Sequence, residues 1–363
     1  MDFSLSGSAN PSYPALILNK YSKIHLPKHD YFIPANIEQN TAELLRASLS
    51  LASWSKNATA MKCFEKFDSQ SPNIHNWPLS EKSICEFVTW AVVVCKLKAA
   101  TIKSYLAAIS LAHKFKGWNS SACNGFLVKS LLKGAENLEF YHDISRESRK
   151  ALSLPILKIL GHQLAVSEMT ENDKLVLWTA AVVAFFGSFR LGEILAKNER
   201  NFNQSDILLR SDVKIKDDSI LLHIKIPKNR IAKGEFVDIF EFDKHNCCPV
   251  KALKKLYLSK GRNLNKNSPV FCFENGKLLT PSLLTSTMRS LLHPRIGAAA
   301  EQLSGHSFRA ALPSALANND VLASDEEIKL WGRWGSPSYK RYIKLEMKRR
   351  RAIFVKIVSS LSY

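Results

Sequence analysis

Apolar residues recur at helical spacing through most of this chain and alternate with polar residues in only one region, residues 212–242. "DVKIKDDSILLHIKIPKN" alternates, turns at Asp217–Asp218, and the alternation resumes in "GEFVDIFEF". A period of two is typical of strands that bury one face. We therefore predict a mainly α-helical protein that contains one small three-stranded antiparallel β-sheet.

The helical pattern divides the chain into two domains. Residues 37–134 hold a series of helical segments, including "PLSEKSICEFVTWAVVVCK", which begins at the predicted N-cap Ser80. Residues 135–150 are charged and lack apolar periodicity, so we expect them to form a linker. Residues 151–345 form the second domain, in which "CPVKALKKLYLSKG", "TPSLLTSTMRSLL", "SFRAALPSALANN" and "SDEEIKLWGRW" predict helices around the sheet.

The two ends of the chain lie outside these domains. Residues 1–36 contain four prolines and little periodicity, and we interpret them as a partly ordered arm. Residues 346–363 join a basic cluster to an apolar segment and form a C-terminal tail. The N-terminus lacks the basic start and apolar core of a signal peptide, and the longest apolar runs, 87–95 and 175–189, are shorter than a membrane span requires.

Charge and cysteine content narrow the choice of partner and compartment. The chain has 51 Lys and Arg against 32 Asp and Glu, a net charge of +19. That excess favours a polyanionic partner, most often nucleic acid. Its 7 cysteines include no CxxC pair, so we predict no zinc module. An odd number of cysteines without a signal peptide indicates a reducing, intracellular compartment.

Two basic motifs are candidates for binding an anion. Arg190, in "FFGSFRLGEILA", lies in an apolar setting, where a guanidinium must meet a carboxylate, a carbonyl or a ligand phosphate. Glu193, one turn later, either orients Arg190 or forms a plain structural ion pair with it. His306 and Arg309, in "GHSFR", lie three residues apart at a predicted helix start, where backbone N–H groups favour an anion.

A third motif, "WGRWGSPSYKRYIK", combines aromatic and basic residues. Ser336–Pro337 is a typical helix start, because serine caps the helix and proline fits its first turn. Tyr339 shares an apolar stripe with Ile343 and Met347, which indicates packing. Tyr342 lies at the edge of that stripe and is better placed to face a basic cleft.

In this order, Arg190, a hairpin lysine, His306, Arg309, Trp334 and Tyr342 resemble the tyrosine recombinase (phage integrase) family. "CPVKAL", "HSFR" and "GRW…RYIK" look most like recombinases of eukaryotic mobile elements of the Crypton and DIRS type. The resemblance implies a two-domain, C-shaped clamp around duplex DNA. Residues 37–134, with "ATIKSYLAAIS", would be the core-binding domain and residues 151–345 the catalytic domain.

The resemblance also implies a role for each residue. Tyr342 would attack a phosphodiester and form a 3′-phosphotyrosyl link, while Arg190 and Arg309 bind the non-bridging oxygens. Trp334 would donate a further hydrogen bond, and His306 would assist proton transfer. Because arginines supply the positive charge and the broken bond is conserved as a protein–DNA link, neither a metal nor another cofactor is expected.

The hairpin offers several candidates for the lysine that protonates the leaving 5′ oxygen. Lys225 belongs to a predicted strand, whereas Lys228 lies just past Pro227, where the turn begins. The family's lysine sits at such a turn, so we choose Lys228, with Lys233 as the alternative. Arg230 in that position would compromise the acid step, since a guanidinium hardly gives up a proton.

These inferences predict a site-specific DNA recombinase or integrase that serves a mobile element and acts in transposition. Expected partners are double-stranded DNA and further copies of the chain, as a tetramer on synapsed DNA with residues 346–363 docking in trans. The location would be intracellular, and nuclear in a eukaryote. A type IB topoisomerase-like enzyme and a catalytically inactive, recombinase-derived DNA-binding protein are the alternatives. The residues expected to contact DNA are Lys103, Lys233, Arg333, Lys340 and Arg341.

Overall fold

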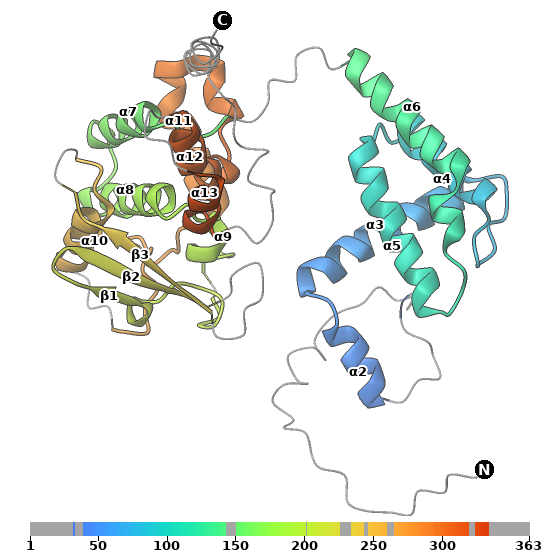
Figure 1. Cartoon of the computed structure of the whole chain (residues 1–363), viewed down its shortest axis with the longest axis horizontal. Coiled ribbons are helices and arrows are strands. Elements are labelled where there is room, and N and C mark those ends of the chain that lie inside the picture. The colour runs from blue at the N-terminus through green and yellow to red at the C-terminus, as the bar shows by residue number, and fades with distance from the viewer. Residues whose placement is uncertain are drawn as a thin grey trace, which may run out of the picture. The chain divides into compact units, whose positions relative to one another are not determined.

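The chain divides into two compact units, Met1–Arg146 and Glu147–Tyr363 (Figure 1). The boundary falls inside the linker predicted at residues 135–150. The structure, a computed structural model, describes residues 32, 39–142, 150–200, 202–225, 234–242, 246–259, 265–318 and 324–333. The arm predicted at residues 1–36 therefore lies almost wholly outside the described residues, and the tail predicted at residues 346–363 lies outside them entirely.

The described part of unit 1 is helical. Its elements are α2 (Gln39–Ala47), α3 (Leu51–Gln70), α4 (Glu81–Val93), α5 (Ala99–Phe115), the 3-10 helix η1 (Ser121–Asn124) and α6 (Phe126–His142). Ser80 caps α4, as predicted, because its hydroxyl accepts a hydrogen bond from the Ser83 amide at 3.1 Å. After α5, Gly117 adopts a φ of +72°, the left-handed conformation that commonly follows a helix.

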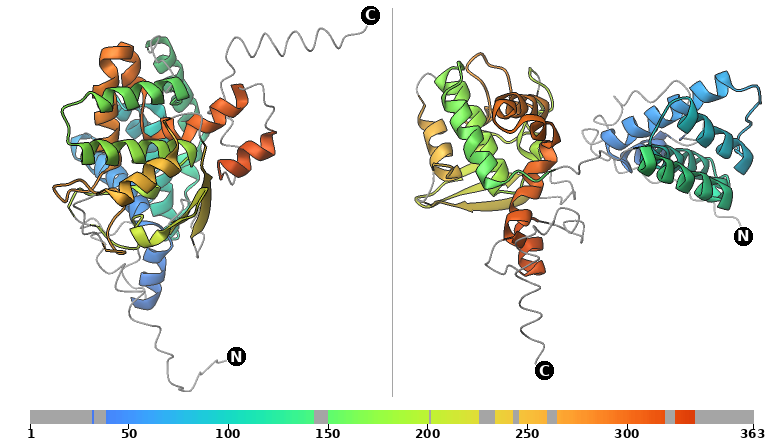
Figure 2. Two further views of the ribbon diagram at one scale, coloured as in Figure 1. Left: turned by 90° about the vertical axis from the view of Figure 1, so that its left-hand side faces the viewer. Right: turned by 90° about the horizontal axis from the view of Figure 1, so that it is seen from above.

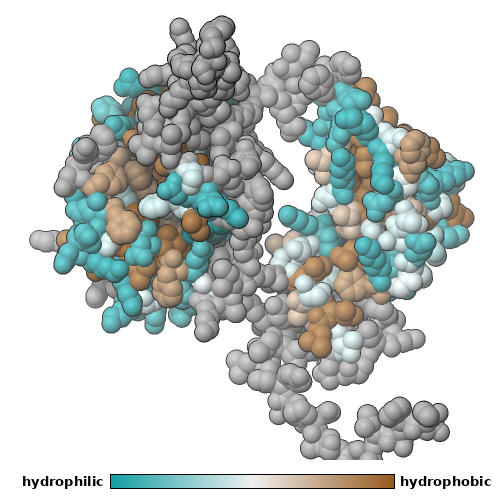
Figure 3. Space-filling view, viewed as in Figure 1, coloured by the Kyte–Doolittle hydropathy of each residue, from teal (hydrophilic) through white to brown (hydrophobic). Residues whose placement is uncertain are grey.

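The core of unit 1 consists of aromatic and aliphatic side chains from α3, α4 and α5. Phe64 and Phe87 meet edge to face, with ring centroids 5.4 Å apart. The buried His113 ring is also satisfied, since its Nε2 accepts from the Leu79 amide at 2.9 Å and its Nδ1 meets the Ile109 carbonyl at 2.8 Å. Apolar side chains also lie on the surface of this unit (Figure 3), where α4 and α6 border a groove of about 510 Å³.

Helix α6 corrects the predicted start of the linker, because residues 135–142 are helical. Among the side chains of α6 that the structure describes, Ala135 is the last buried apolar one, and Leu138, one turn later, is exposed. The following segment is instead held by polar contacts with α5. Glu139 accepts a hydrogen bond from the Ala99 amide at the start of α5, and Glu136 pairs with Lys103 at 2.6 Å.

Unit 2 is a helical domain with one sheet, and the helices predicted within its described residues are present. The helix predicted to start at Ser336–Pro337 lies outside the described residues. Its helices are α7 (Leu154–Ala165), α8 (Glu171–Phe186), α9 (Leu191–Ile194), α10 (Pro249–Leu258), α11 (Pro281–Ile296), α12 (Gly305–Asn318) and α13 (Asp325–Trp331), with 3-10 helices η2 (Arg210–Asp212) and η3 (Gly297–Gln302). Helix α8 packs against α7, α10 and α12. This central position explains why α8, after a polar first turn, is apolar on nearly all sides.

The predicted sheet is confirmed as antiparallel, in the order β1 (Val213–Ile215), β2 (Ser219–Ile224), β3 (Glu235–Phe240). Ile220 pairs with Ile239, and the alternate residues of β2 are buried. Strand β3 contacts α10, and two views show the sheet along one side of the helices of unit 2 (Figures 1 and 2). Within the described ranges, no helix is both long and apolar enough to cross a membrane.

Candidate active site

The chain makes a tight elbow between α8 and the candidate residue Arg190. Ser188, which follows the C-cap Gly187, has a φ of 46° in the left-handed region. This conformation costs a non-glycine residue about 1–2 kcal/mol. A Cβ added to Gly187 would lie 2.0 Å from the Phe189 ring, so glycine is needed for the close approach of that ring. The elbow therefore sets the position of Arg190, the N-cap of α9, relative to the end of α8.

A similar turn follows α13, and Arg309 joins the two turns. Arg333, after the C-cap Gly332, has a φ of 53°. From α12, Arg309 donates from Nη1 to the Ser188 carbonyl at 2.5 Å and from Nη2 to the Arg333 carbonyl at 3.2 Å. One guanidinium thus binds carbonyls at the ends of two helices, where the helix dipoles favour a cation.

Glu193 binds two arginines and is almost completely buried, with 5 % of its side chain exposed. It accepts from Arg190 Nη1 at 2.7 Å and from Arg333 Nη2 at 3.1 Å. Burial by itself would raise the pKa of the Glu193 carboxyl, but Arg333 and Arg190 outweigh burial and hold its pKa below the ordinary value. Glu193 is therefore an anion that organises both arginines, as the sequence interpretation allowed.

Arg333 completes the group, which we call the arginine cluster: Arg190, Glu193, Glu235, Arg309 and Arg333. Its Nη1 donates to Glu235, the first residue of β3, at 3.1 Å, and its guanidinium carbon lies 4.6 Å from the centre of the Phe189 ring. The cluster thus connects α9, α12, β3 and the end of α13.

The arginine cluster carries an excess of positive charge. Within these five described residues there are three guanidinium groups and two carboxylates, and the carboxylates bind Arg190 and Arg333. Burial, together with the positive charges of Arg333 and Arg190, lowers the pKa of Arg309 to about 9. An additional anion would compensate that charge, and Arg190, with 29 % of its side chain exposed, is the most accessible of the three arginines. These features suit the binding of a phosphate.

The structure places some predicted residues here and leaves others outside its range. Arg190 and Arg309 are brought together, and His306 is exposed in the first turn of α12. Arg333 lies inside the cluster, and Lys103 lies in unit 1, paired with Glu136. Their predicted roles, in catalysis or at DNA, stay predictions. The predicted residues outside the described ranges are Lys228, Lys233, Trp334, Lys340, Arg341 and Tyr342.

The described end of β2 bears on the choice of lysine. Lys225 pairs with Asp212 at 2.6 Å and also donates to the Gln204 carbonyl at 2.6 Å. A lysine held by a carboxylate in this way is poorly suited to deliver a proton to DNA. Lys228 and Lys233 thus remain the two candidates.

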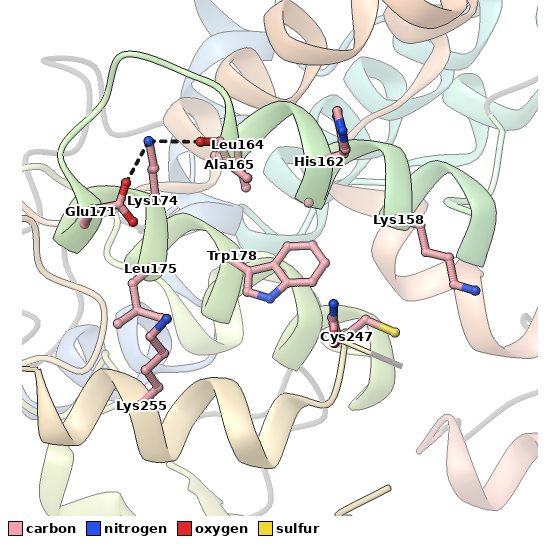
Figure 4. Close-up of a pocket in the computed structure, with 12 residues that line it drawn as sticks. Lys158, His162, Leu164, Ala165, Glu171, Lys174, Leu175, Trp178, Cys247 and Lys255 are labelled. Atoms are coloured by element: carbon pink, nitrogen blue, oxygen red, sulfur yellow. Dashed lines mark hydrogen bonds and ion pairs between the residues drawn. The ribbon is translucent and has the colours of Figure 1, made fainter. Parts of the chain in front are cut away.

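Apart from the arginine cluster, unit 2 has a cleft of about 680 Å³ between α7, α8 and α10. Trp178 lies at its centre, with Lys158, Lys174 and Lys255 around it (Figure 4). Lys174 is engaged by Glu171 at 2.8 Å. This cleft shares no lining residue with the arginine cluster. Among the residues that the structure describes, no group of His, Cys, Asp and Glu is arranged to hold a metal ion.

The lowered pKa of Glu193 predicts a stability effect in acid. A carboxyl whose pKa is lower in the folded state stabilises the fold at neutral pH, and this stabilisation is lost as pH falls past the ordinary carboxyl pKa and through the lowered folded-state pKa. We expect Glu193→Gln to be less stable than the unchanged chain at pH 7, and the difference to shrink towards pH 3. Urea unfolding at pH 7, 5 and 3 measures it.

The control for this experiment is Glu171→Gln, which removes an exposed carboxylate paired with Lys174. Solvent screens that pair, so its removal should change the free energy of unfolding much less. A difference between the Glu193→Gln variant and the unchanged chain that stays constant from pH 7 to pH 3 would contradict the assignment.

Comparison with known proteins identifies the fold. No family model and no curated protein matches the chain. XerH site-specific recombinase bound to palindromic difH substrate, in a post-cleavage complex, matches with a TM-score of 0.58 and 16 % identity, covering 87 % of this chain and 83 % of that one. XerH bound to difH substrate in a pre-cleavage complex matches with a TM-score of 0.52 and 13 % identity, covering 89 % and 83 %. The chain therefore has the fold of the tyrosine recombinases.

Proposed function

We propose that this chain is a site-specific DNA recombinase or integrase that cleaves and rejoins duplex DNA through a covalent 3′-phosphotyrosyl intermediate. It would recombine the DNA of a mobile genetic element of the Crypton or DIRS type. It would act inside the cell, and in the nucleus of a eukaryotic host. The fold supports this class, and so does a net charge of +19.

The observation that carries the proposal is the arginine cluster. Two motifs far apart in sequence bring Arg190 and Arg309 into one cluster, where Arg190 binds Glu193 and Arg309 binds the Ser188 and Arg333 carbonyls. The five residues of the cluster comprise three arginines and two glutamates. A phosphodiester gains negative charge on its non-bridging oxygens as a nucleophile attacks. Guanidinium groups held in advance at that position stabilise the transition state more than the ground state.

The proposed reaction breaks one phosphodiester bond and forms another. The hydroxyl oxygen of Tyr342 attacks phosphorus, and His306 assists the departure of its proton. The bond from phosphorus to the 5′ oxygen breaks, and that oxygen takes a proton from Lys228. Because the 3′-phosphotyrosyl bond conserves the energy of the broken link, a 5′ hydroxyl from another strand can reverse the reaction and join the strands without an external energy source.

The experiment uses duplexes selected from a randomised pool by their binding to this chain. They are resynthesised with a nick near the selected centre, so that a short fragment diffuses away after cleavage and rejoining is prevented. A recombinase accumulates as a protein–DNA band that survives a denaturing gel. The absence of such a band on DNA that the chain binds tightly would refute the proposed activity and leave a DNA-binding protein.

The leaving-group lysine has a chemical signature. Lys228→Ala is expected to slow cleavage of ordinary DNA by about 10²- to 10⁴-fold, because the 5′ oxygen leaves without its acid. DNA with sulfur in place of that oxygen should be cleaved nearly as fast by the variant as by the unchanged chain, since a thiolate needs no proton to leave. Single-turnover rates on both substrates measure this effect.

Lys233→Ala is the matched variant for the leaving-group lysine. If Lys233→Ala shows the defect and its repair by sulfur, the role belongs to Lys233. If neither variant cleaves the sulfur-containing DNA faster than ordinary DNA, neither Lys228 nor Lys233 is the acid.

A further inference from the structure

Arg333 connects parts of unit 2 that lie far apart in sequence. Its Nη2 donates to Glu193 of α9 and its Nη1 to Glu235 of β3, each at 3.1 Å. Its carbonyl accepts from Arg309 of α12. A single residue thus holds α9, β3 and α12 against the end of α13.

Each of these connections adjoins a segment with a predicted role in the reaction. Glu193 binds Arg190 directly. Glu235 begins β3, and Lys228 and Lys233 come shortly before it in the sequence. In the sequence, Arg333 is followed immediately by Trp334 and then by the segment with Tyr342.

We propose that Arg333 is a positioning residue: its forked guanidinium fixes β3, which Lys228 and Lys233 precede in the sequence, and the segment that begins at Trp334 relative to Arg190. This inference rests on the proposed recombinase function. Arg333 would act through other residues and not by touching DNA. It replaces our sequence-based expectation that Arg333 contacts DNA.

Two observations separate positioning from DNA contact. Both Nη atoms of Arg333 bind carboxylates, those of Glu193 and Glu235, so its charge is compensated inside the protein, whereas both Nη atoms of Arg309 bind carbonyls. Its backbone also keeps a φ of 53°, a conformation that persists where the surroundings enforce it. A guanidinium can bind two carboxylates at once with fixed geometry, whereas a lysine ammonium lacks that fork.

The test compares Arg333→Met, Arg333→Lys and Glu235→Gln with the unchanged chain. Arg289→Met is the control, because it also removes one positive charge, outside the cluster, together with an ion pair to Glu301 and a hydrogen bond to the Leu303 carbonyl. DNA affinity, thermal unfolding and the single-turnover rate of the covalent complex are measured. The rate is taken at saturating amounts of the nicked, binding-selected duplex and below every unfolding transition.

We expect Arg333→Met and Arg333→Lys to form the covalent complex about 100-fold more slowly, since small misplacements of reacting groups have effects of this size. Their DNA affinity should fall no further than that of Arg289→Met. Glu235→Gln should also form the covalent complex more slowly than the unchanged chain. It serves as the test if the Arg333 variants fail to fold. Because Arg333→Lys retains the charge, a slow rate in that variant identifies the lost fork.

Other results would overturn the inference. They are a wild-type rate in Arg333→Met, full restoration by Arg333→Lys, or a loss confined to DNA affinity. If the Arg333 variants fail to fold, a wild-type rate in Glu235→Gln would also overturn the inference. If the unchanged chain forms no covalent complex, the proposed function fails and this inference fails with it. A covalent complex in the unchanged chain with no slowing in any folded variant refutes the positioning role alone.

Discussion

Tyr342→Phe is expected to abolish the covalent protein–DNA complex, lowering its rate of formation by at least about three orders of magnitude. The substitution removes the proposed nucleophilic oxygen and keeps the ring, so packing and DNA affinity should change little. Single-turnover trapping on the nicked duplex measures the rate, and equilibrium binding to intact duplex of the same sequence measures the affinity.

Tyr339→Phe is the matched control, because Tyr339 lies three residues earlier and belongs to the predicted packing stripe. It should trap DNA at a rate within a few-fold of the unchanged chain. If Tyr342→Phe still gave the covalent band and Tyr339→Phe lost it, the nucleophile would be Tyr339. That outcome would refute the choice of Tyr342 as nucleophile from its position in the predicted helix.

Arg309→Met is expected to be the most destabilising substitution in the arginine cluster. Arg309 is 1 % exposed, and its removal leaves the Ser188 and Arg333 carbonyls without their donor. Each lost partner costs about 1–3 kcal/mol, partly offset because a cation is no longer buried. We expect a net loss of about 2–4 kcal/mol, which lowers the unfolding midpoint of a unit of this size by roughly 5–15 °C.

Calorimetry or circular dichroism during heating measures that shift. Arg289→Met, which removes a partly exposed guanidinium, should lower the unfolding midpoint by only a few degrees. Below its own unfolding transition, the Arg309→Met variant should also cleave DNA at least about 10²-fold more slowly, because the proposed phosphate donor is lost. An unfolding midpoint within about 2 °C of the unchanged chain would contradict the role of Arg309 in joining the two turns.

Much of the fold could be predicted because hydrophobic periodicity records which side chains are buried. The alternation in residues 212–242 gave the sheet, and helical spacing gave the helices of both units. The predicted linker started too early for a physical reason. Residues 135–142 remain helical through polar contacts such as that of Glu139 with the start of α5, and these leave no apolar pattern.

The candidate site was predictable only in part. Arg190 stood out because a basic residue in an apolar segment needs a partner, and Arg309 because it lies three residues after His306 at a predicted helix start. The contact of Arg333 with Glu235 joins residues 98 positions apart and has no local sequence signal. The left-handed turns at Ser188 and Arg333 were equally hidden, since neither is glycine. In each case a glycine immediately before, Gly187 or Gly332, was the sole local sign of a helix end.

The most direct test of the covalent mechanism is to identify the amino acid that carries the DNA. The trapped complex is digested with nuclease and protease, and the peptide that retains a nucleotide is sequenced by mass spectrometry. Our account predicts a nucleotide linked through its 3′ phosphate to Tyr342. A link to Tyr339 or to a serine, or a 5′ phosphate at the linkage, would contradict it.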